Sequence, residues 1–213
     1  MSSAQKKDFI QPLEFKFSAV NLKKIEAFIA KYPKGRQASA VMPLLDLAQR
    51  QQGGWIPEKA MEEIGRILDM PKIKVFEVAT FYTMYNLEPK GKHHIQVCTT
   101  TPCWLSGSAE VVTACEKHLG VKMGGTTADG EFTLSEVECL GACVNAPVFQ
   151  HNGDEFYEDL TPETVVKVLD DLKAGKTPAT SQKGRHKSMG ATGATSLLAQ
   201  AKKAGVKIAG DGT

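Results

Sequence analysis

Two short cysteine loops limit how this 213-residue chain can fold. Cys98 and Cys103 form a C-x4-C spacing, and Cys139 and Cys143 follow after 35 intervening residues as C-x3-C. Four thiols arranged in two pairs need a fold that brings two separate loops together. They allow four explanations, which are a disulfide framework, a zinc site, a redox dithiol and an iron-sulfur cluster.

The cysteine count and the expected compartment argue against disulfides. Five cysteines is an odd number, and the N-terminal sequence MSSAQKKDFIQPLEF contains acidic residues and lacks the apolar segment of a signal peptide. No run approaches the roughly 18 apolar residues of a membrane span. We therefore expect a cytoplasmic protein, where thiols stay reduced, and bound metal becomes the preferred explanation for the cysteines.

The thiol spacing favours an iron-sulfur cluster. Zinc knuckles usually use tighter C-x2-C turns, and the C-x-x-C motif of a thioredoxin-type dithiol is absent. A 2Fe-2S cluster has two irons that each need two thiolates, so each loop can supply one pair. Small loop residues would let backbone N–H groups approach the sulfurs: Thr99, Thr100, Gly141 and Ala142. The alternative from a different functional class is a structural or interaction module that is held together by a zinc ion.

The fifth cysteine and the histidines are predicted to serve the fold. Cys115 lies on the apolar stripe of a helix predicted over residues 104–119, about 18 Å along the axis from Cys103 at about 1.5 Å per residue, so we expect a buried hydrophobe. Trp104 is expected to make the first core contact of this helix. Neither cysteine loop encloses the histidines that a Rieske centre needs, and we interpret all five histidines as structural or solvated.

Hydrophobic periodicity predicts an α+β protein that begins with a helical bundle. Apolar residues at helical spacing predict four helices between residues 21 and 90, with Asn21 as the cap of the first. The second is predicted over residues 38–52. Pro57 and Pro71 are predicted to open the third and the fourth.

The pattern changes after residue 90. Short strands are predicted at residues 94–97 and 132–137, with the helix 104–119 between them. Asn152-Gly153 between two apolar pairs predicts a β-hairpin, and Thr161 followed by proline predicts the cap of a last helix. Strand, helix, strand, hairpin and helix in this order indicate a small α/β layer of the thioredoxin type.

The charge distribution sets a tail apart. Residues 176–213 contain seven Lys or Arg and one acid, which leaves 19 basic and 23 acidic residues for the rest of the chain. The tail has too few apolar residues for a core, so it is either a solvated extension or an arm that orders against a partner. It lacks the dense Arg and interleaved aromatics typical of nucleic-acid binding. The predicted domains are residues 1–90, helical; 91–175, thioredoxin-like; and 176–213, the basic extended tail.

The residues around the cysteines resemble a known family. The stretches VATFYTMYNLEPKGKHHIQVCTTTPCW and ECLGACVNAPVFQHNGDEFYEDLTPE are similar to the thioredoxin-like 2Fe-2S subunit (NuoE-type) of the NADH-oxidising module of respiratory complex I, a proton-pumping NADH:quinone oxidoreductase. The resemblance covers residues 15–175 and implies a ferredoxin domain with one 2Fe-2S cluster. It implies four ligands, the first two on one iron and the last two on the other: Cys98, Cys103, Cys139 and Cys143. The tail sequence GRHKSMGATGATSL resembles, more loosely, the C-terminal extension of mitochondrial and related bacterial members.

The resemblance implies an electron-transfer subunit with no catalytic site of its own. A single 2Fe-2S cluster accepts one electron at a time, whereas NADH delivers a hydride, so a flavin must lie elsewhere. The sequence has no G-x-G-x-x-G motif, and FMN and NADH are expected on a NuoF-type flavoprotein partner. Further expected partners are other peripheral-arm subunits, at the cytoplasmic side of the bacterial inner membrane. Similar subunits serve NAD-linked hydrogenases and formate dehydrogenases, which the cysteine loops do not distinguish; the tail favours complex I and is expected to order along a partner.

Overall fold

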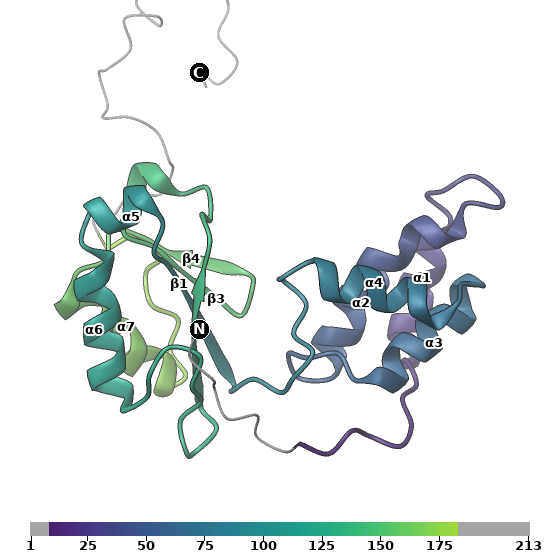
Figure 1. Cartoon of the computed structure of the whole chain (residues 1–213), viewed down its shortest axis with the longest axis horizontal. Helices are drawn as coiled ribbons and strands as arrows, with labels where there is room; N and C mark the ends of the chain where they lie inside the picture. Colours follow the sequence, from purple (N-terminus) through teal and green to yellow (C-terminus); the bar gives the residue numbers. More distant parts are fainter. Residues whose placement is uncertain (1–8, 183–213) are drawn as a thin grey trace, which may run out of the picture.

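In the computed structural model, which describes residues 9–182, a group of helices lies beside a four-stranded sheet that carries helices of its own (Figure 1). The predicted α+β class is confirmed. None of the helices within residues 9–182 has the length and apolar character needed to cross a membrane. The expectations for His186 and for the tail beyond residue 182 lie outside the described residues.

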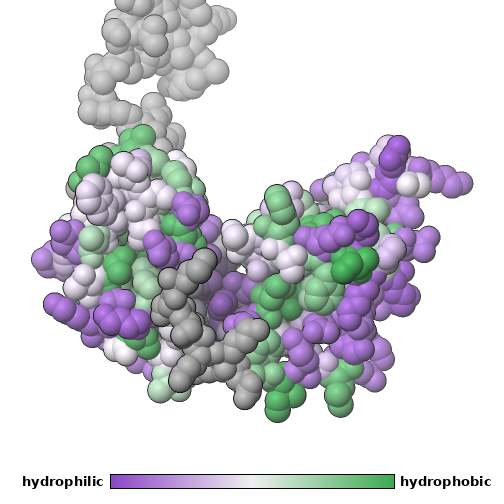
Figure 2. All heavy atoms as spheres, viewed as in Figure 1, coloured by the Kyte–Doolittle hydropathy of each residue, from purple (hydrophilic) through white to green (hydrophobic). Residues whose placement is uncertain are grey.

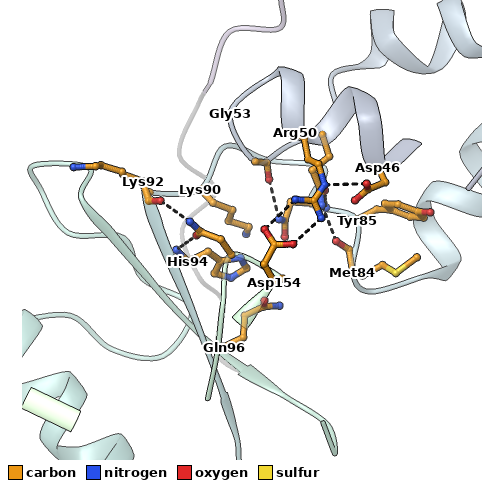
Figure 3. Close-up of a pocket in the computed structure, with 16 residues that line it drawn as sticks. Asp46, Arg50, Gly53, Met84, Tyr85, Lys90, Lys92, His94, Gln96 and Asp154 are labelled. Atoms are coloured by element: carbon orange, nitrogen blue, oxygen red, sulfur yellow. Dashed lines mark hydrogen bonds and ion pairs between the residues drawn. The ribbon is translucent and has the colours of Figure 1, made fainter. Parts of the chain in front are cut away.

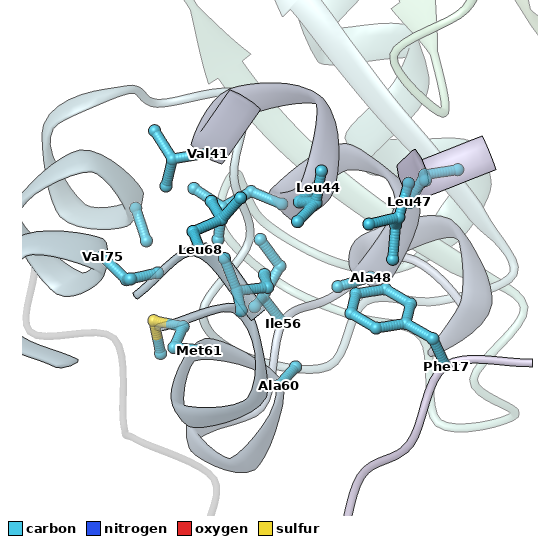
Figure 4. Packing of buried hydrophobic residues seen from close by; sticks show 14 of the residues in the cluster. Phe17, Val41, Leu44, Leu47, Ala48, Ile56, Ala60, Met61, Leu68 and Val75 are labelled. Carbon is cyan, nitrogen blue, oxygen red and sulfur yellow. The ribbon is translucent and has the colours of Figure 1, made fainter. Parts of the chain in front are cut away.

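The N-terminal helices pack around one apolar core. They are α1 (Ala19–Ile29), the 3-10 helix η1 (Gln37–Ala40), α2 (Val41–Gln51), α3 (Glu58–Leu68) and α4 (Lys72–Phe81). The predicted inward residues Leu44, Met61 and Ile64 are fully buried in this core (Figure 4). Pro57 and Pro71 directly precede α3 and α4, as predicted. Burial of their apolar faces holds these short helices together.

The first helix begins earlier than predicted. Its cap is Ser18, whose hydroxyl accepts a hydrogen bond from the backbone N–H of Asn21 at 3.3 Å. Asn21 lies inside the helix, and its amide donates to Gln51 Oε1 at 2.9 Å. Both residue types cap helices well, and the Ser18 N–H also donates to Gln51 Oε1 at 2.9 Å, so Gln51 on α2 holds both residues at this helix start.

The sheet is mixed and has the strand order β2-β1-β3-β4. Its strands are β1 (His93–Cys98), β2 (Phe132–Val137), β3 (Phe149–His151) and β4 (Glu155–Tyr157). Strand β1 runs parallel to β2 and antiparallel to β3. The predicted hairpin joins β3 to β4. Asn152 and Gly153 both have positive φ, as the tight Asn-Gly hairpin turn requires at its two central residues.

Two helices pack against each other on one side of the sheet (Figure 1). These are α6 (Ser108–Leu119) and α7 (Pro162–Lys173). Thr161 caps α7 with a reciprocal capping box, which confirms the predicted start of that helix. Cys115 has no exposed surface and packs in the apolar core between these helices and the sheet. Burial raises the pKa of its thiol to about 12, as expected for a core residue.

The prediction of a single helix over residues 104–119 is wrong. The chain forms a short helix, α5 (Thr101–Leu105), and α6 starts only after Gly107, which adopts φ +97°. Because this left-handed glycine turns the chain, the side chains of α5 do not continue the buried stripe of α6. Trp104 is 61% exposed instead of making the predicted core contact.

An ion pair links the helical region to the sheet region. The Arg50 guanidinium donates from Nη1 and Nη2 to the two carboxylate oxygens of Asp154, at 2.9 and 2.7 Å, and from Nε to Asp46 at 2.9 Å (Figure 3). It borders a pocket of about 510 Å³ whose lining also includes Lys90 and His94. None of the four cysteines of the two loops lines this pocket.

We expect Asp154→Asn to loosen the two regions with little loss of stability. The hydrogen bonds from Arg50 lower the pKa of the Asp154 carboxyl, so the pair stabilises the fold above the ordinary pKa of aspartate and stops doing so as the pH falls through the lowered value. Both side chains are about half exposed, so the free energy of unfolding should change by less than about 1 kcal/mol. Small-angle scattering should report a larger radius of gyration. Asp46→Asn, which keeps the link to Asp154, is the control and should leave the radius unchanged.

Candidate metal centre

The first cysteine loop is buried and lies at the end of a strand. Cys98 is the last residue of β1, and Cys103 lies in α5, which begins three residues after it. Each cysteine is 1% exposed. The hydroxyl of Thr100 lies 3.2 Å from Cys98 Sγ, and the backbone N–H of Trp104 donates to the Thr100 carbonyl. The strand end and the short helix therefore hold both thiols in one compact turn.

The second cysteine loop is exposed and follows β2. Cys139 and Cys143 are both solvent-accessible, and their sulfurs lie 3.4 Å apart. Gly141 has φ +79° and donates its backbone N–H to Cys139 Sγ at 3.4 Å. Cys143 begins the 3-10 helix η2 (Cys143–Asn145). The left-handed glycine lets the chain turn back so that both thiols point the same way.

The two loops meet. The backbone N–H of Cys98 donates to the Val148 carbonyl at 3.1 Å, five residues beyond Cys143. Cys98, Cys103 and Val148 form a small buried cluster, against which Leu140 and Ala142 of the second loop pack. The structure thus brings all four predicted thiols to one end of the sheet, although 35 residues separate the two pairs in the sequence.

The two thiols of the buried pair have pKa values that are shifted in opposite directions. Burial opposes ionisation of Cys98, yet hydrogen bonds from Thr100, Cys103 and the Leu140 backbone lower the pKa of its thiol below the ordinary value. Burial, followed by the neighbouring Cys98 sulfur, raises the pKa of Cys103 to about 12. A bound metal takes up such groups as thiolates, with release of their protons.

The donor set fits a 2Fe-2S cluster. It consists of thiols alone, arranged as one pair for each of two irons, which is the usual ligand shell of this cluster. Backbone N–H groups of Leu140 and Gly141 lie against the sulfurs, where they offset negative charge. Within residues 9–182, no group of three or more His, Cys, Asp and Glu side chains is drawn together closely enough to hold a metal ion as it stands. The thiols form two pairs, and the loops that carry them pack together around Val148.

The described histidines make contacts that belong to the fold. His93 Nδ1 and His151 Nε2 lie 3.0 Å apart, and His94 Nε2 lies 2.9 Å from the Ser135 hydroxyl. Burial lowers the pKa of His94 to about 4, which keeps the ring neutral near pH 7. His118 pairs with Asp170 at 2.8 Å.

The apolar surface beside the thiols was missed by the sequence analysis. Leu105 is 73% exposed and Val144 is 68% exposed, next to the exposed Trp104. Figure 2 shows hydrophobic side chains at the end of the sheet region where α5 lies in Figure 1. Ser106-Gly107 was the available signal, since glycine in a helical pattern commonly marks a helix end. We call Trp104, Leu105 and Val144 the thiol-side patch.

Comparison with protein families identifies one domain. Residues 25–173 match the thioredoxin-like 2Fe-2S ferredoxins. The match covers both cysteine loops and most of the helical region, and it confirms the predicted thioredoxin-like ferredoxin fold.

Close relatives are found in bacteria and in a eukaryote. The E subunit of the NADH-quinone oxidoreductase of Rickettsia conorii is 58% identical over 159 residues, which are 75% of this chain and 95% of the relative. Its counterpart in Rickettsia felis is 57% identical over 157 residues, 74% of this chain and 93% of the relative. The mitochondrial NADH dehydrogenase (ubiquinone) flavoprotein 2 of Dictyostelium discoideum is 50% identical over 185 residues, 86% of this chain and 74% of the relative.

Among solved structures, an NAD+-reducing NiFe hydrogenase has a similar fold. Its crystal structure in the H2-reduced state aligns with a TM-score of 0.55 at 20% identity, covering 64% of this chain and 23% of the hydrogenase chain. The air-oxidised form gives a TM-score of 0.54 at 19% identity, covering 62% and 23%. At this identity the likeness concerns the fold alone.

Proposed function

The chain belongs to the thioredoxin-like 2Fe-2S ferredoxin family, and we propose that its two cysteine loops bind the cluster with two thiolates on each iron: Cys98 and Cys103 on one, Cys139 and Cys143 on the other. The protein is the 2Fe-2S electron-transfer subunit of an NADH-quinone oxidoreductase, respiratory complex I. The observation that carries the ligand assignment is the meeting of the two loops around Cys98, Cys103 and Val148.

The two loops would hold a redox group in different environments, one buried and one exposed. When bound, a 2Fe-2S cluster takes up and releases one electron at a time. The first loop excludes water from its pair of sulfurs, since Cys98 and Cys103 are each 1% exposed. The second loop keeps Cys139 and Cys143 at the surface. Electron exchange with another protein requires a short distance between the two redox groups, so this exposed pair is the side that a partner can approach. The chain thus supplies a buried and an accessible side.

We propose that the partner at the accessible side is the flavoprotein subunit that carries FMN and the NADH site. The thiol-side patch supports this, because Trp104 and Leu105 follow Cys103 directly and Val144 follows Cys143. Three exposed apolar side chains around exposed thiols are typical of a protein interface, and the aromatic residue suits its centre. A hydride acceptor that passes on single electrons is what such a flavoprotein provides.

Three further assignments are proposals of the same kind. We propose residues 1–90 as a helical domain, 91–175 as the thioredoxin-like domain and 176–213 as a basic extension. The protein would lie at the cytoplasmic side of the bacterial inner membrane, held there by other peripheral-arm subunits. The alternative, an equivalent subunit of an NAD-linked hydrogenase or formate dehydrogenase, has weaker support, because the hydrogenase is 20% identical and the Rickettsia conorii relative is 58% identical.

Anaerobic purification of the full chain tests the function. We expect a red-brown protein with about two irons and about two labile sulfides per chain, because four thiolates complete the shell of one 2Fe-2S cluster. Dithionite reduction should bleach the visible spectrum and produce an electron paramagnetic resonance (EPR) signal from one unpaired electron. One zinc per chain without sulfide would contradict the proposal and favour a structural zinc module.

A further inference from the structure

A buried polar network lies where the described part of the chain ends. The backbone N–H of Glu158 donates to the Thr180 carbonyl at 2.7 Å, and the N–H of Gln182 donates to the Glu158 carbonyl at 3.2 Å. Residues 180–182 therefore run alongside the residue that follows β4, as a parallel bridge. Ser181 at the centre of this bridge is 5% exposed, and its hydroxyl donates to Asp159 Oδ2 at 3.1 Å.

Asp159 is held in an unfavourable backbone conformation at this point. It has φ +56°, in the left-handed region that non-glycine residues rarely occupy, and it is 3% exposed. Such a residue persists when its surroundings fix it, and here its N–H donates to the Asn145 carbonyl at 2.8 Å. The hydrogen bond from Ser181 fixes its side chain as well.

The network continues to the second cysteine loop. Asn145 is 1% exposed and ends η2, the 3-10 helix that Cys143 begins. Its side-chain amide donates to Glu158 Oε2 at 2.8 Å, and the N–H of Leu160 donates to the Pro147 carbonyl at 3.1 Å. Three hydrogen bonds thus tie the 158–160 turn to the residues directly after Cys143, at Asn145 O, Asn145 Nδ2 and Pro147 O.

These contacts matter because the second loop packs only in part against the rest of the fold, through Leu140 and Ala142. Cys139, Gly141 and Cys143 are exposed, whereas the first loop is anchored in the small apolar cluster. A loop whose apolar residues are only partly buried depends more on hydrogen bonds to neighbouring segments for its geometry. The 158–160 turn and residues 180–182 supply those hydrogen bonds from outside the loop.

We propose that Asn145, Asp159 and Ser181, the clasp, are positioning residues for Cys143, and that residues 180–182 thereby control the accessible side of the cluster. The proposal rests on the proposed function, since it requires Cys143 as a ligand. The clasp touches no metal itself. Its hydrogen bonds fix the position of the Cys143 sulfur. That position determines the symmetry of the ligand shell around a bound cluster and how firmly the cluster is retained.

Two truncations and one point variant of the full chain test the clasp. A chain that ends after Gln182 keeps the hydrogen bonds of residues 180–182 to Glu158 and Asp159 described above, and we expect it to have the EPR spectrum of the full-length protein. A chain that ends after Pro178, and Ser181→Ala, should both show altered g values of the reduced cluster. They should also lose iron to a chelator roughly tenfold faster, the effect of one buried hydrogen bond.

Thr133→Val is the matched control. Thr133 is 1% exposed, its hydroxyl accepts a hydrogen bond from the Gly91 N–H at 2.7 Å, and it lies toward the opposite end of β2 from Val137, which pairs with Cys98. It should destabilise the fold without changing the g values. Unchanged g values in Ser181→Ala, or an equal change in Thr133→Val, would overturn the proposal. Cys143→Ser separates the two hypotheses: a wild-type spectrum there would contradict the ligand assignment itself.

Discussion

Replacing Cys103 by alanine is expected to abolish the visible absorption and the EPR signal of the protein. Cys103 is 1% exposed in the small cluster with Cys98 and Val148, so the place that its sulfur leaves is shielded from replacement ligands. An iron with three protein ligands in this cluster is readily lost. We expect iron and sulfide below about one tenth of the wild-type content, since an incomplete ligand shell forfeits most of the binding free energy. Metal analysis and absorption spectroscopy of the purified variant measure this.

Cys115→Ala is the control for that experiment. Its thiol is fully buried in the core between the sheet and the helices α6 and α7, so it is a packing residue. The variant should keep the full spectrum and lose about 1 kcal/mol of stability in denaturant unfolding, as small core truncations do. Loss of colour in Cys115→Ala, or retention of colour in Cys103→Ala, would show that the ligands are assigned wrongly.

Local signals predicted those parts of the fold that short segments determine. The helix cap at Thr161 and the Asn152-Gly153 turn depend on neighbouring residues only, and both are present where predicted. The same holds for the buried residues of α2 and α3, because helical periodicity directly reports the face that is buried. The thiol spacing then indicated a site built from two pairs of thiols.

Local patterns failed where competing choices have similar local free energies. Ser18 and Asn21 both suit a helix cap, and Gln51 on α2 contacts both of them, because its Oε1 accepts hydrogen bonds from the Ser18 N–H and from the Asn21 side-chain amide. The apolar stripe of α6 extends in sequence to Trp104, so periodicity concealed the break at Gly107. That break is what exposes α5 and creates the thiol-side patch.

Long-range polar contacts left no pattern in the sequence. Arg50 and Asp154 are 104 residues apart, and Ser181 and Asp159 are 22 apart. Such pairs form only after the sheet and the helices have brought distant segments together. Charged and hydroxyl side chains are also common on surfaces, so their presence in a sequence predicts no particular partner.

Leu105→Asp should weaken association with the flavoprotein subunit roughly a hundredfold, because a carboxylate buried against an apolar surface without a partner loses its hydration. Leu105 is 73% exposed, so the free subunit should fold and keep its cluster. Trp104→Ala should reduce affinity as well, by about tenfold or more, since large aromatic side chains dominate interfaces. Biosensor titration of the flavoprotein against each variant gives the dissociation constants, and the visible spectrum confirms that each variant carries the cluster.

Ile73→Asp provides the comparison that makes this result specific. Ile73 is 64% exposed on α4, in the helical region, and is similar to Leu105 in size and exposure. The substitution introduces the same charge on a surface away from the cysteine loops, so any general effect of charge on solubility or association appears in both variants. We expect wild-type affinity for Ile73→Asp. Equal losses in the two variants would contradict docking at the thiol-side patch, and so would wild-type affinity in Leu105→Asp, because a partner that exchanges electrons at Cys139 and Cys143 must cover the side chains beside them.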